Sequence, residues 1–564
     1  MLNYKKLADQ FIIVFLYAIP LILLAGYDFS FVTYDSEPDY VSAAFHINKY
    51  GLPFSSHHPG TITQYLISLP LLVGNYFHFP FSVTVILMRL TELVVLAILI
   101  FSSINLMIFS KIKTKLFCYS LVWLLIFIYP SSSVLFRYIS AEILLFGVSF
   151  LTCALWFKHL KDENNCMLIG FIIASGMNIK PTFIFLLIVL SSFHILSYAY
   201  YSKTYRGFRA LIKIFTYGIV FFTIFSIPKI FQIMPIMLNM VNDWFRLINS
   251  IFSMLLFWQF LLLGAIISST LYLFYWAKNK GILSHNQSNY LNNSIKEGWV
   301  IAIPVALFVL YKLYYYFIHP EIDYLVGLGQ WESLGIMRRN SIPLYAFLVF
   351  FILKEVIKKI LKLGNFKPLL ISFLLIFTGT IASTVSASKP HIFQKSHVRL
   401  FDQSVIDLKK VIPEARIYVY HDNYFDSLIQ FYMWTSIRYG NCNDDRLKET
   451  LTISYPDLNF DNFSYISATR GISRCDSNIS NNDYVSLYNR WLNVAKDVVK
   501  SDLCSEFNSV SNNKVFLLDR RYVDVISSDE IIAKLNLAIE TCGFKMNKNI
   551  NYFVNSEILA YDIY

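Results

Sequence analysis

Charged residues are scarce in this sequence. Only 15% of its 564 residues are Asp, Glu, Lys or Arg, whereas 56% are hydrophobic, and the mean hydropathy is +0.50. Soluble domains carry about one quarter charged residues. The composition therefore excludes an ordinary soluble protein and predicts an integral membrane protein.

Other signals are also missing. The first apolar run, Phe11 to Ala25, is followed by no convincing small-residue cleavage site, so we expect a signal anchor instead of a cleaved signal peptide. The chain shows no internal repeat and no low-complexity linker. The net charge is +11, but most basic residues of the apolar part fall in short loops such as Lys111–Lys115. Basic loops of this kind set orientation in a bilayer and do not indicate a nucleic-acid partner.

Apolar runs predict a polytopic α-helical fold of about eleven transmembrane helices, since each span needs about 20 apolar residues. The predicted spans are 10–26, 82–109, 116–131, 138–157, 166–179, 182–200, 210–227, 249–277, 299–317, 342–363 and 368–387. The distribution of Lys and Arg places the N-terminus in the cytoplasm and the C-terminal part outside. The broken apolar segment 61–77 is expected to lie along the outer interface.

The composition changes near residue 389. Residues 1–388 are predicted to form the transmembrane domain, with an acidic outer loop at 27–81, and residues 389–564 a soluble α/β domain outside the membrane. The predicted strands of this domain are 416–420, 463–466 and 514–518, the predicted helices 422–434 and 484–499, and 551–564 a closing hairpin. Ser527 and Glu530 predict a capping box that opens a helix ending near Thr541.

The cysteines fall into two groups. Cys118, Cys153 and Cys166 lie in or beside apolar segments, whereas Cys442, Cys475, Cys504 and Cys542 lie in the hydrophilic C-terminal part. Four cysteines in an exported domain favour two disulfides, for which three connectivities are open. Free thiols are the alternative, and the spacings are too wide for a structural zinc site.

Titratable residues concentrate after the first apolar segment. Asp35 and Glu37 are separated by one residue, Asp39 follows, and His57 and His58 are adjacent. In an extended segment Asp35 and Glu37 point the same way, so they can deprotonate a hydroxyl or hold a divalent cation. The alternative is a solvated loop that happens to be acidic.

Other outer positions carry isolated polar residues. Lys180, Arg338 and Arg339 are candidates to bind an anion, and Glu142 to accept from a hydroxyl. Each has a plainer interpretation. The arginines would extend their side chains to the membrane interface at the end of a span, and Glu142 would cap a helix N-terminus. Lys180 beside a helix break must either reach the interface or have an anionic partner.

The first loop resembles that of the GT-C glycosyltransferases, in the branch of protein mannosyltransferases and lipid A aminoarabinose transferases. The resemblance lies in the acidic pair Asp35 and Glu37, then Asp39-Tyr40 with small residues, then His57-His58-Pro59. Ser140-Ala-Glu142, Gly176 to Pro181 and Arg338-Arg339 occupy places where the family has polar features. Gly60 stands where a second proline is expected, which weakens the link to one subfamily.

The resemblance implies an inverting transferase in a bacterial inner membrane, facing the periplasm. The donor would be a sugar on polyprenyl phosphate, and the acceptor an envelope glycan, glycolipid or protein, with O-antigen or lipopolysaccharide favoured. Asp35 would be the base, and Glu37 a second carboxylate that orients or binds metal. Asp39, Tyr40, His57, His58, Glu142, Lys180, Arg338 and Arg339 would bind substrate. The need for a divalent cation stays open.

Two other classes compete with this prediction. A flippase or transporter of lipid-linked saccharides places ionisable residues inside its spans, and here Arg89 and Glu92 are the clearest, one turn apart and able to pair. A polymerase of surface polysaccharide shares the lipid donor and the many spans. It usually has a large loop between late spans, whereas the large hydrophilic region here is terminal.

Overall fold

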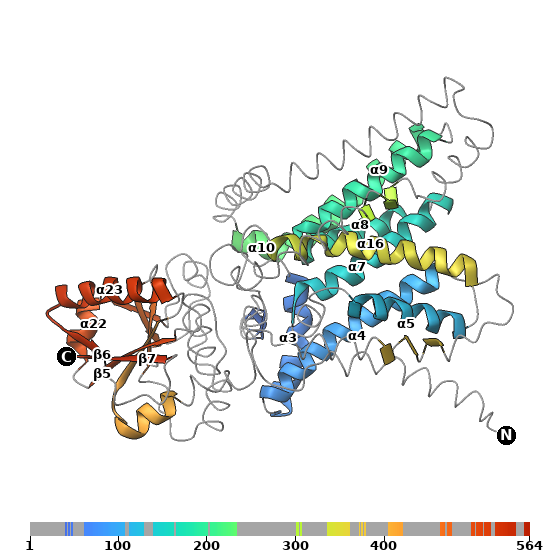
Figure 1. The fold of residues 1–564 in the computed structure, drawn as a ribbon. Helices are drawn as coiled ribbons and strands as arrows, with labels where there is room; N and C mark the ends of the chain where they lie inside the picture. Colours follow the sequence, from blue (N-terminus) through green and yellow to red (C-terminus); the bar gives the residue numbers. More distant parts are fainter. Residues whose placement is uncertain are drawn as a thin grey trace.

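The structure is a computed structural model and describes part of the chain. The described residues are 61–79, 81–107, 112–128, 139–162, 165–200, 204–233, 335–360, 404–420, 463–467, 471–475, 498–501, 503–510, 513–519, 525–548 and 558–564, with parts of 40–48, 301–306 and 371–378. The helices of the first part pack into a bundle, and the strands form a separate sheet (Figure 1).

The helical bundle follows the apolar runs of the sequence. Its helices are α3 (Thr61–Tyr76), α4 (Phe81–Met107), α5 (Ile112–Ile128), α7 (Ala141–Asp162), α8 (Cys166–Ile179), the 3-10 turn η1 (Pro181–Phe183), α9 (Ile184–Tyr200), α10 (Thr204–Ile233) and α16 (Gly335–Ile360). Among the described residues, three segments are long and apolar enough to cross a membrane: Val83–Met107, Ala141–His159 and Gly207–Phe225. The mostly helical, apolar architecture predicted from composition is therefore present, and the number of spans remains a prediction.

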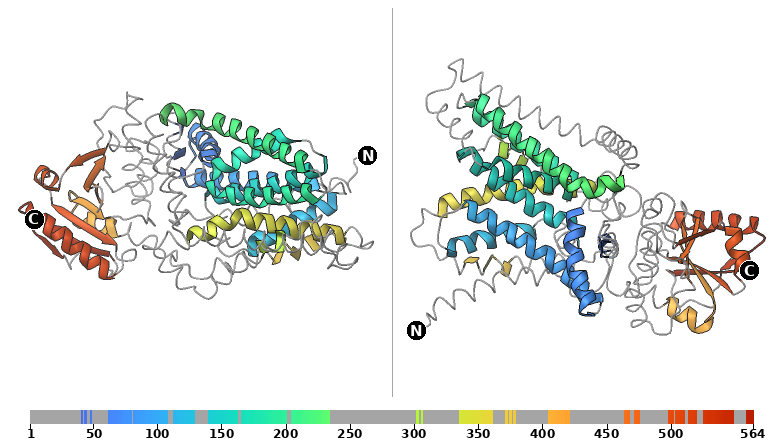
Figure 2. Two further views of the ribbon diagram at one scale, coloured as in Figure 1. Left: turned by 90° about the horizontal axis from the view of Figure 1, so that it is seen from above. Right: turned by 180° about the vertical axis from the view of Figure 1, so that it is seen from behind.

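Helix α7 lies inside the bundle, and α10 lies on its outside. In the apolar segment of α7, 89% of residues are buried, against 17% in that of α10. Gly147 lets α7 approach α4, because a Cβ there would lie 2.8 Å from Leu99 Cδ1. Figure 2 shows α10 along one flank of the bundle. The exposed apolar side chains of α10 suit contact with lipid.

Among the described residues the sheet is mixed and has seven strands, in the order β4-β3-β2-β1-β5-β7-β6. The strands are β1 (Arg416–Tyr420), β2 (Phe463–Ser467), β3 (Gly471–Cys475), β4 (Val498–Ser501), β5 (Lys514–Asp519), β6 (Met546–Lys548) and β7 (Ile558–Ile563). The central strand β1 pairs in parallel with β2 and β5, and the remaining pairs are antiparallel.

Side chains alternate between the two faces of this sheet, as strand geometry requires. Tyr418 and Phe516 pack with Phe507 of α22 (Leu503–Ser509) and Ile539 of α23 (Val525–Thr541). Ile417, the residue before Tyr418 on β1, belongs to another buried cluster, which also contains Val405 and Leu408 of the helix at 404–411. Helices thus lie on both faces of the sheet, the arrangement of an α/β fold.

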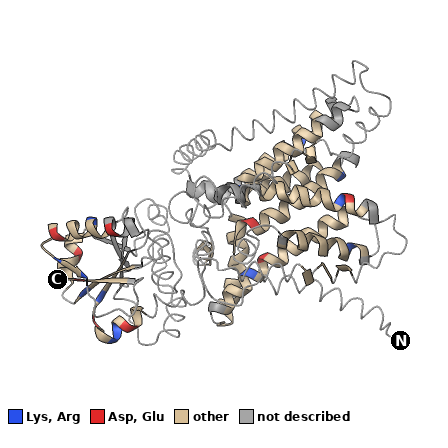
Figure 3. Cartoon of the chain, viewed as in Figure 1, with Lys and Arg blue, Asp and Glu red and all other residues tan. Residues whose placement is uncertain are grey.

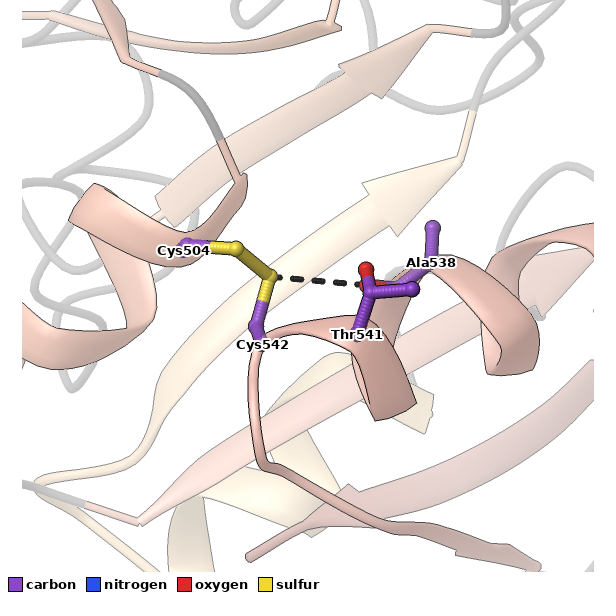
Figure 4. The surroundings of a disulfide bond; sticks show 4 residues. All are labelled: Cys504, Ala538, Thr541 and Cys542. Carbon is purple, nitrogen blue, oxygen red and sulfur yellow. Dashed lines mark hydrogen bonds between the residues drawn. A yellow bond between two sulfur atoms is a disulfide. The ribbon is translucent and has the colours of Figure 1, made fainter.

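A disulfide joins α22 to the end of α23. Cys504 and Cys542 are bonded, and Cys542 Sγ also lies 3.4 Å from the carbonyl oxygen of Ala538 (Figure 4). One of the two expected disulfides is therefore present, and a second one between Cys442 and Cys475 stays a prediction. Cys442 lies outside the described residues, and Cys118, Cys153 and Cys166 are free.

Three boundaries predicted from the sequence are wrong. Helix α23 begins at Val525, so Ser527 lies inside its first turn and does not cap it. A Ser and a Glu three residues apart are also compatible with the interior of a helix, so this pair alone does not define where the helix starts. Val498 and Val499 belong to β4, not to a helix, since these β-branched residues pair with Cys475 and Arg474. Helix α16 begins at Gly335 instead of residue 342, because residues 336–339 favour helix and Pro343 is accommodated inside it.

Candidate functional site

Lys180 ends helix α8 because Pro181 follows it. A residue before proline is pushed from helical into extended backbone, and Lys180 has φ −158 and ψ 131. Its backbone N–H still donates to the Gly176 carbonyl at 2.9 Å. The Lys180 side chain therefore leaves the chain at the end of α8.

Glu142 is the acidic residue in the first turn of α7, where the helix dipole favours a negative charge. Lys180 Nζ donates to Glu142 Oε1, and this salt bridge is nearly enclosed, with side chains 15% and 2% exposed respectively. Of the two outcomes open for Lys180, the structure shows the anionic partner. The partner comes from another helix, which the sequence could not indicate.

A second carboxylate lies close to the same end of α7. Glu92 of α4 is buried, and its Oε2 accepts a hydrogen bond from the backbone N–H of Ser140, at 3.2 Å. Ser140 directly precedes α7. Arg89, one turn before Glu92, is also buried. Whether Arg89 and Glu92 pair, as the sequence suggests, stays a prediction.

These contacts gather at one end of the bundle. The ion pair joins the end of α8 to the start of α7, and the Glu92 contact joins α4 to the same start. Figures 1 and 2 show that α3 and the first turns of α16 also reach this end. Charged residues also lie at the opposite end of the bundle (Figure 3), among them Lys115, Lys158 and Lys354, but these are only partly buried. The fully buried charged residues of the bundle's described helices, Arg89, Glu92 and Glu142, lie toward this end, which makes it the candidate functional site.

The first turn of α3 adds uncharged polar groups. Thr61, Thr63 and Gln64 are buried, and none of their side-chain polar atoms has a hydrogen-bond partner among the described residues. Each such group costs about 1–3 kcal/mol when it stays unsatisfied. Nothing in the sequence alone selects these residues, because Gln64 stands there only as a polar interruption of an apolar run.

The predicted acidic loop lies mostly outside the described residues. Asp35, Glu37, Asp39, His57 and His58 all fall there. Tyr40 is described, is helical and is 3% exposed. Asn48 follows on the same segment, and its Nδ2 donates to the Ser68 carbonyl at 3.2 Å. The end of the segment that begins at Tyr40 is thus attached to α3.

Arg338 and Arg339 lie near the start of α16, although only their backbone is described. A helix start presents free N–H groups and a partial positive charge. Arginines at such a start add full charges to this field. The arrangement suits an anion, whereas the sequence had placed both residues in a loop before the helix.

No metal site emerges in the part of the chain that the structure describes. No group of three or more His, Cys, Asp or Glu residues there is arranged to hold an ion. The candidate ligands Asp35 and Glu37 lie outside it. The use of a divalent cation therefore remains a prediction about the acidic loop.

The described residues define a class: an apolar helical bundle with a charged cluster at one end, in a chain that also carries a mixed α/β sheet. No family profile matches the chain, and no curated protein matches it. Two solved structures align with it over 98% of its length, both of ArnT from Cupriavidus metallidurans.

The apo ArnT structure has 11% sequence identity and a TM-score of 0.41, with 98% of its own chain covered. The structure bound to undecaprenyl phosphate has 10% identity and the same TM-score, with 97% covered. At these values the likeness decides neither the fold nor the activity of this chain. Any function must be argued from the chain's own residues.

Proposed function

We propose that the protein is a membrane glycosyltransferase that moves a sugar from a polyprenyl-phosphate carrier to an envelope glycan or glycolipid. The single observation that carries the proposal is that the buried charged residues of the bundle's described helices, Arg89, Glu92 and Glu142, lie toward the same end of the bundle, where Glu142 pairs with Lys180. A lipid-linked donor has its reactive phosphate at the membrane face. A transferase that uses it therefore needs its polar groups there and not along its spans.

The acidic loop supplies the chemistry in this proposal. Asp35 takes the proton of the acceptor hydroxyl while that oxygen attacks the anomeric carbon, and Glu37 orients the site or binds a cation. The bond from the anomeric carbon to the phosphate oxygen breaks, which releases polyprenyl phosphate and inverts the anomeric centre. A base positioned in this way contributes about 10²–10⁴-fold.

The leaving phosphate gains negative charge and needs positive groups nearby. Arg338 and Arg339 at the start of α16 are the foremost candidates, because the helix N-terminus reinforces them. Lys180 is already neutralised in large part by Glu142. We assign that pair to hydroxyl recognition and positioning, since together they donate and accept, and we retain His57, His58, Asp39 and Tyr40 as substrate-binding residues.

The envelope acceptor is the finer part of the proposal. We propose O-antigen or lipopolysaccharide sugars, on the periplasmic face of a bacterial inner membrane, with residues 389–564 on the same side. The disulfide between Cys504 and Cys542 supports an oxidising compartment for that part of the chain. A free glycan and a protein remain the other acceptors to be tested.

One observation bears on the transporter alternative. Arg89 and Glu92 are buried in α4, within the apolar segment Val83–Met107. At 1.5 Å per residue they lie roughly 9 and 14 Å from the start of that segment, short of its midpoint at roughly 18 Å. The partner of Glu92 is the backbone at the start of α7. This places them toward the polar end, whereas a transporter site is expected near the midplane.

The test uses the purified full-length chain in lipid nanodiscs, with polyprenyl phosphate carrying a radiolabelled sugar and an envelope glycan fraction as acceptor. The proposal predicts label on the acceptor and release of polyprenyl phosphate. In liposomes, a flippase would instead change the sidedness of the labelled lipid without releasing it. A ladder of growing products would indicate a polymerase, and a single addition a transferase.

A further inference from the structure

The first turn of α3 holds several buried polar side chains without partners next to one another. Many Ser and Thr side chains within the described helices donate to the carbonyl three or four residues earlier. Examples are Ser68 to Tyr65 at 2.7 Å, Thr91 to Leu87 at 2.7 Å and Ser120 to Leu116 at 2.9 Å, although Ser149 and Ser191 are single buried hydroxyls without a partner among the described residues. Thr61 and Thr63 lie in the first turn of α3, and neither hydroxyl has a hydrogen-bond partner among the described residues.

Gln64 adds further buried polar atoms that lack hydrogen-bond partners. Its side chain is fully buried, and neither its Nε2 nor its Oε1 has a partner within the described part of the chain. It lies one helical turn after Thr61, so the two share a face of α3. The first backbone N–H groups of a helix also lack intrahelical acceptors. One turn thus offers hydroxyl, amide and N–H groups that are shielded from bulk water.

We propose that the first turn of α3, through Thr61, Thr63 and Gln64, binds the hydroxyl groups of a saccharide substrate; this rests on the proposed glycosyltransferase function. The three side chains carry no charge and both donate and accept hydrogen bonds. Sugar hydroxyls have the same property, whereas a phosphate would select cations. Buried polar groups of a binding site normally become satisfied by the ligand that they recognise.

Two features connect this turn to the rest of the site. Helix α3 packs against α8, whose end carries Lys180. The last turn of α3 packs against the start of α4, where a Cβ on Gly74 would lie 2.5 Å from Thr84 Oγ1. The first turn is therefore the end of α3 directed away from the α4 start, toward the ends of α7 and α8 (Figures 1 and 2).

The saccharide can belong to either of two substrates, the lipid-linked donor or the envelope acceptor. The test measures thermal stabilisation of the full-length protein in detergent by polyprenyl phosphate alone, by polyprenyl phosphate carrying a hexose, an N-acetylhexosamine or a pentose, and by a purified lipopolysaccharide fraction. Thr63→Val and Gln64→Met are compared with wild type. The matched control is Ser68→Ala, since Ser68 is buried on the same helix but has a partner inside it.

The proposal predicts that both variants match or exceed the melting temperature of the ligand-free wild type, because they remove unsatisfied polar groups. It also predicts that each lost hydrogen bond weakens saccharide binding by about tenfold, whereas stabilisation by bare polyprenyl phosphate persists. Loss confined to the lipid-linked sugars identifies the donor, and loss confined to the lipopolysaccharide fraction identifies the acceptor. Ser68→Ala keeps every ligand response.

Variants that keep full sugar-dependent stabilisation overturn the inference alone. Variants that lower the ligand-free melting temperature while wild-type sugar binding is intact also overturn it, because they show that bound water or the chain itself satisfies these groups. A wild type that gains no stability from any sugar-bearing ligand overturns the proposed function together with this inference.

Discussion

Glu142 and Lys180 are 38 residues apart in sequence, yet their side chains form a nearly enclosed ion pair between the start of α7 and the end of α8. Enclosed charges are costly to separate, because removing one partner leaves the other without compensation. We therefore expect Glu142→Gln and Lys180→Met each to destabilise the protein by about 3 kcal/mol or more. The double variant is expected to lose less than the sum, and thermal unfolding of all four proteins in detergent measures this.

The control for this cycle is the exposed pair Asp407 and Lys410, whose side chains are 40% and 65% exposed. Exposed pairs contribute about 0–1 kcal/mol, so Asp407→Asn and Lys410→Met should leave the melting temperature almost unchanged. Strictly additive losses for Glu142 and Lys180 would show that the two side chains act independently, and the positioning role given to them would then be wrong.

Helices α8 and α10 approach closely at Gly170. A Cβ there would lie 2.8 Å from the backbone nitrogen of Gly218 and 2.9 Å from the Ile214 carbonyl oxygen, and backbone atoms cannot rotate away. Gly170→Ala should therefore separate the helices and cost about 1–3 kcal/mol. The melting temperature of the full-length protein in detergent reports this loss.

The matched control lies across the same contact. A Cβ on Gly218 would meet its nearest neighbour, Ile173 Cγ2, at 3.5 Å, which is ordinary contact. Gly218→Ala should be neutral or stabilise by up to about 1 kcal/mol through helix propensity. Equal losses from Gly170→Ala and Gly218→Ala would contradict the described crossing.

Much of the fold could be predicted from local pattern. The strand at 416–420 matches β1, and the predicted span 166–179 matches α8, because alternation and apolar length are local properties. The predicted interfacial segment 61–77 is the helix α3, although its position relative to a membrane is untested. Local pattern failed at Val498, where pairing with β3 overrides the helical periodicity.

The candidate site was less predictable, because it depends on contacts between distant elements. Lys180 and Glu142 could each be selected as a polar residue at a helix end, but nothing in the sequence joins them. Thr61 and Gln64 were not selected, since a burial that leaves polar groups without partners is visible only in three dimensions. Their position directly after His57 to Gly60 was the one available signal.

The disulfide between Cys504 and Cys542 closes a loop with a sequence separation of 38 residues. Chain entropy predicts a stabilisation of about 3–4 kcal/mol for a loop of this length. Cys504→Ser with Cys542→Ser should lower the urea midpoint of the C-terminal part, as resolved by pulse proteolysis of the full-length protein. Cys166→Ser is the control, because that cysteine is free; equal midpoints for the two variants would be inconsistent with the bond.

Lys409 is buried beside β1, and its Nζ donates to the carbonyl oxygens of Pro413 and Ala415 at 3.0 and 2.7 Å. Burial lowers the pKa of Lys409 from 10.5 to about 8. Between these values the unfolded chain holds a proton that the folded chain has lost, so the free energy of unfolding rises with pH. The rise should be roughly 1–3 kcal/mol between about pH 8 and about pH 10.5.

Lys409→Met removes this titration. Pulse proteolysis at about pH 7 and about pH 10 should therefore show a pH-dependent gain in the wild type that the variant lacks. The variant also loses two hydrogen bonds, so its stability should be lower at both pH values. If the free energy of unfolding of Lys409→Met rose with pH as much as that of the wild type, other groups would be responsible for the pH dependence of stability.

The measurement that tests the central claim most directly is transfer of labelled sugar from polyprenyl phosphate by wild type, Asp35→Asn and the surface control Asp407→Asn. Asparagine keeps the shape of aspartate and removes the base. The account predicts that Asp35→Asn accumulates normally in the membrane and loses about 10²-fold or more in transfer rate, while Asp407→Asn transfers like wild type. Normal transfer by Asp35→Asn would contradict the account, because the acidic loop would then be a solvated surface and the transporter alternative would take precedence.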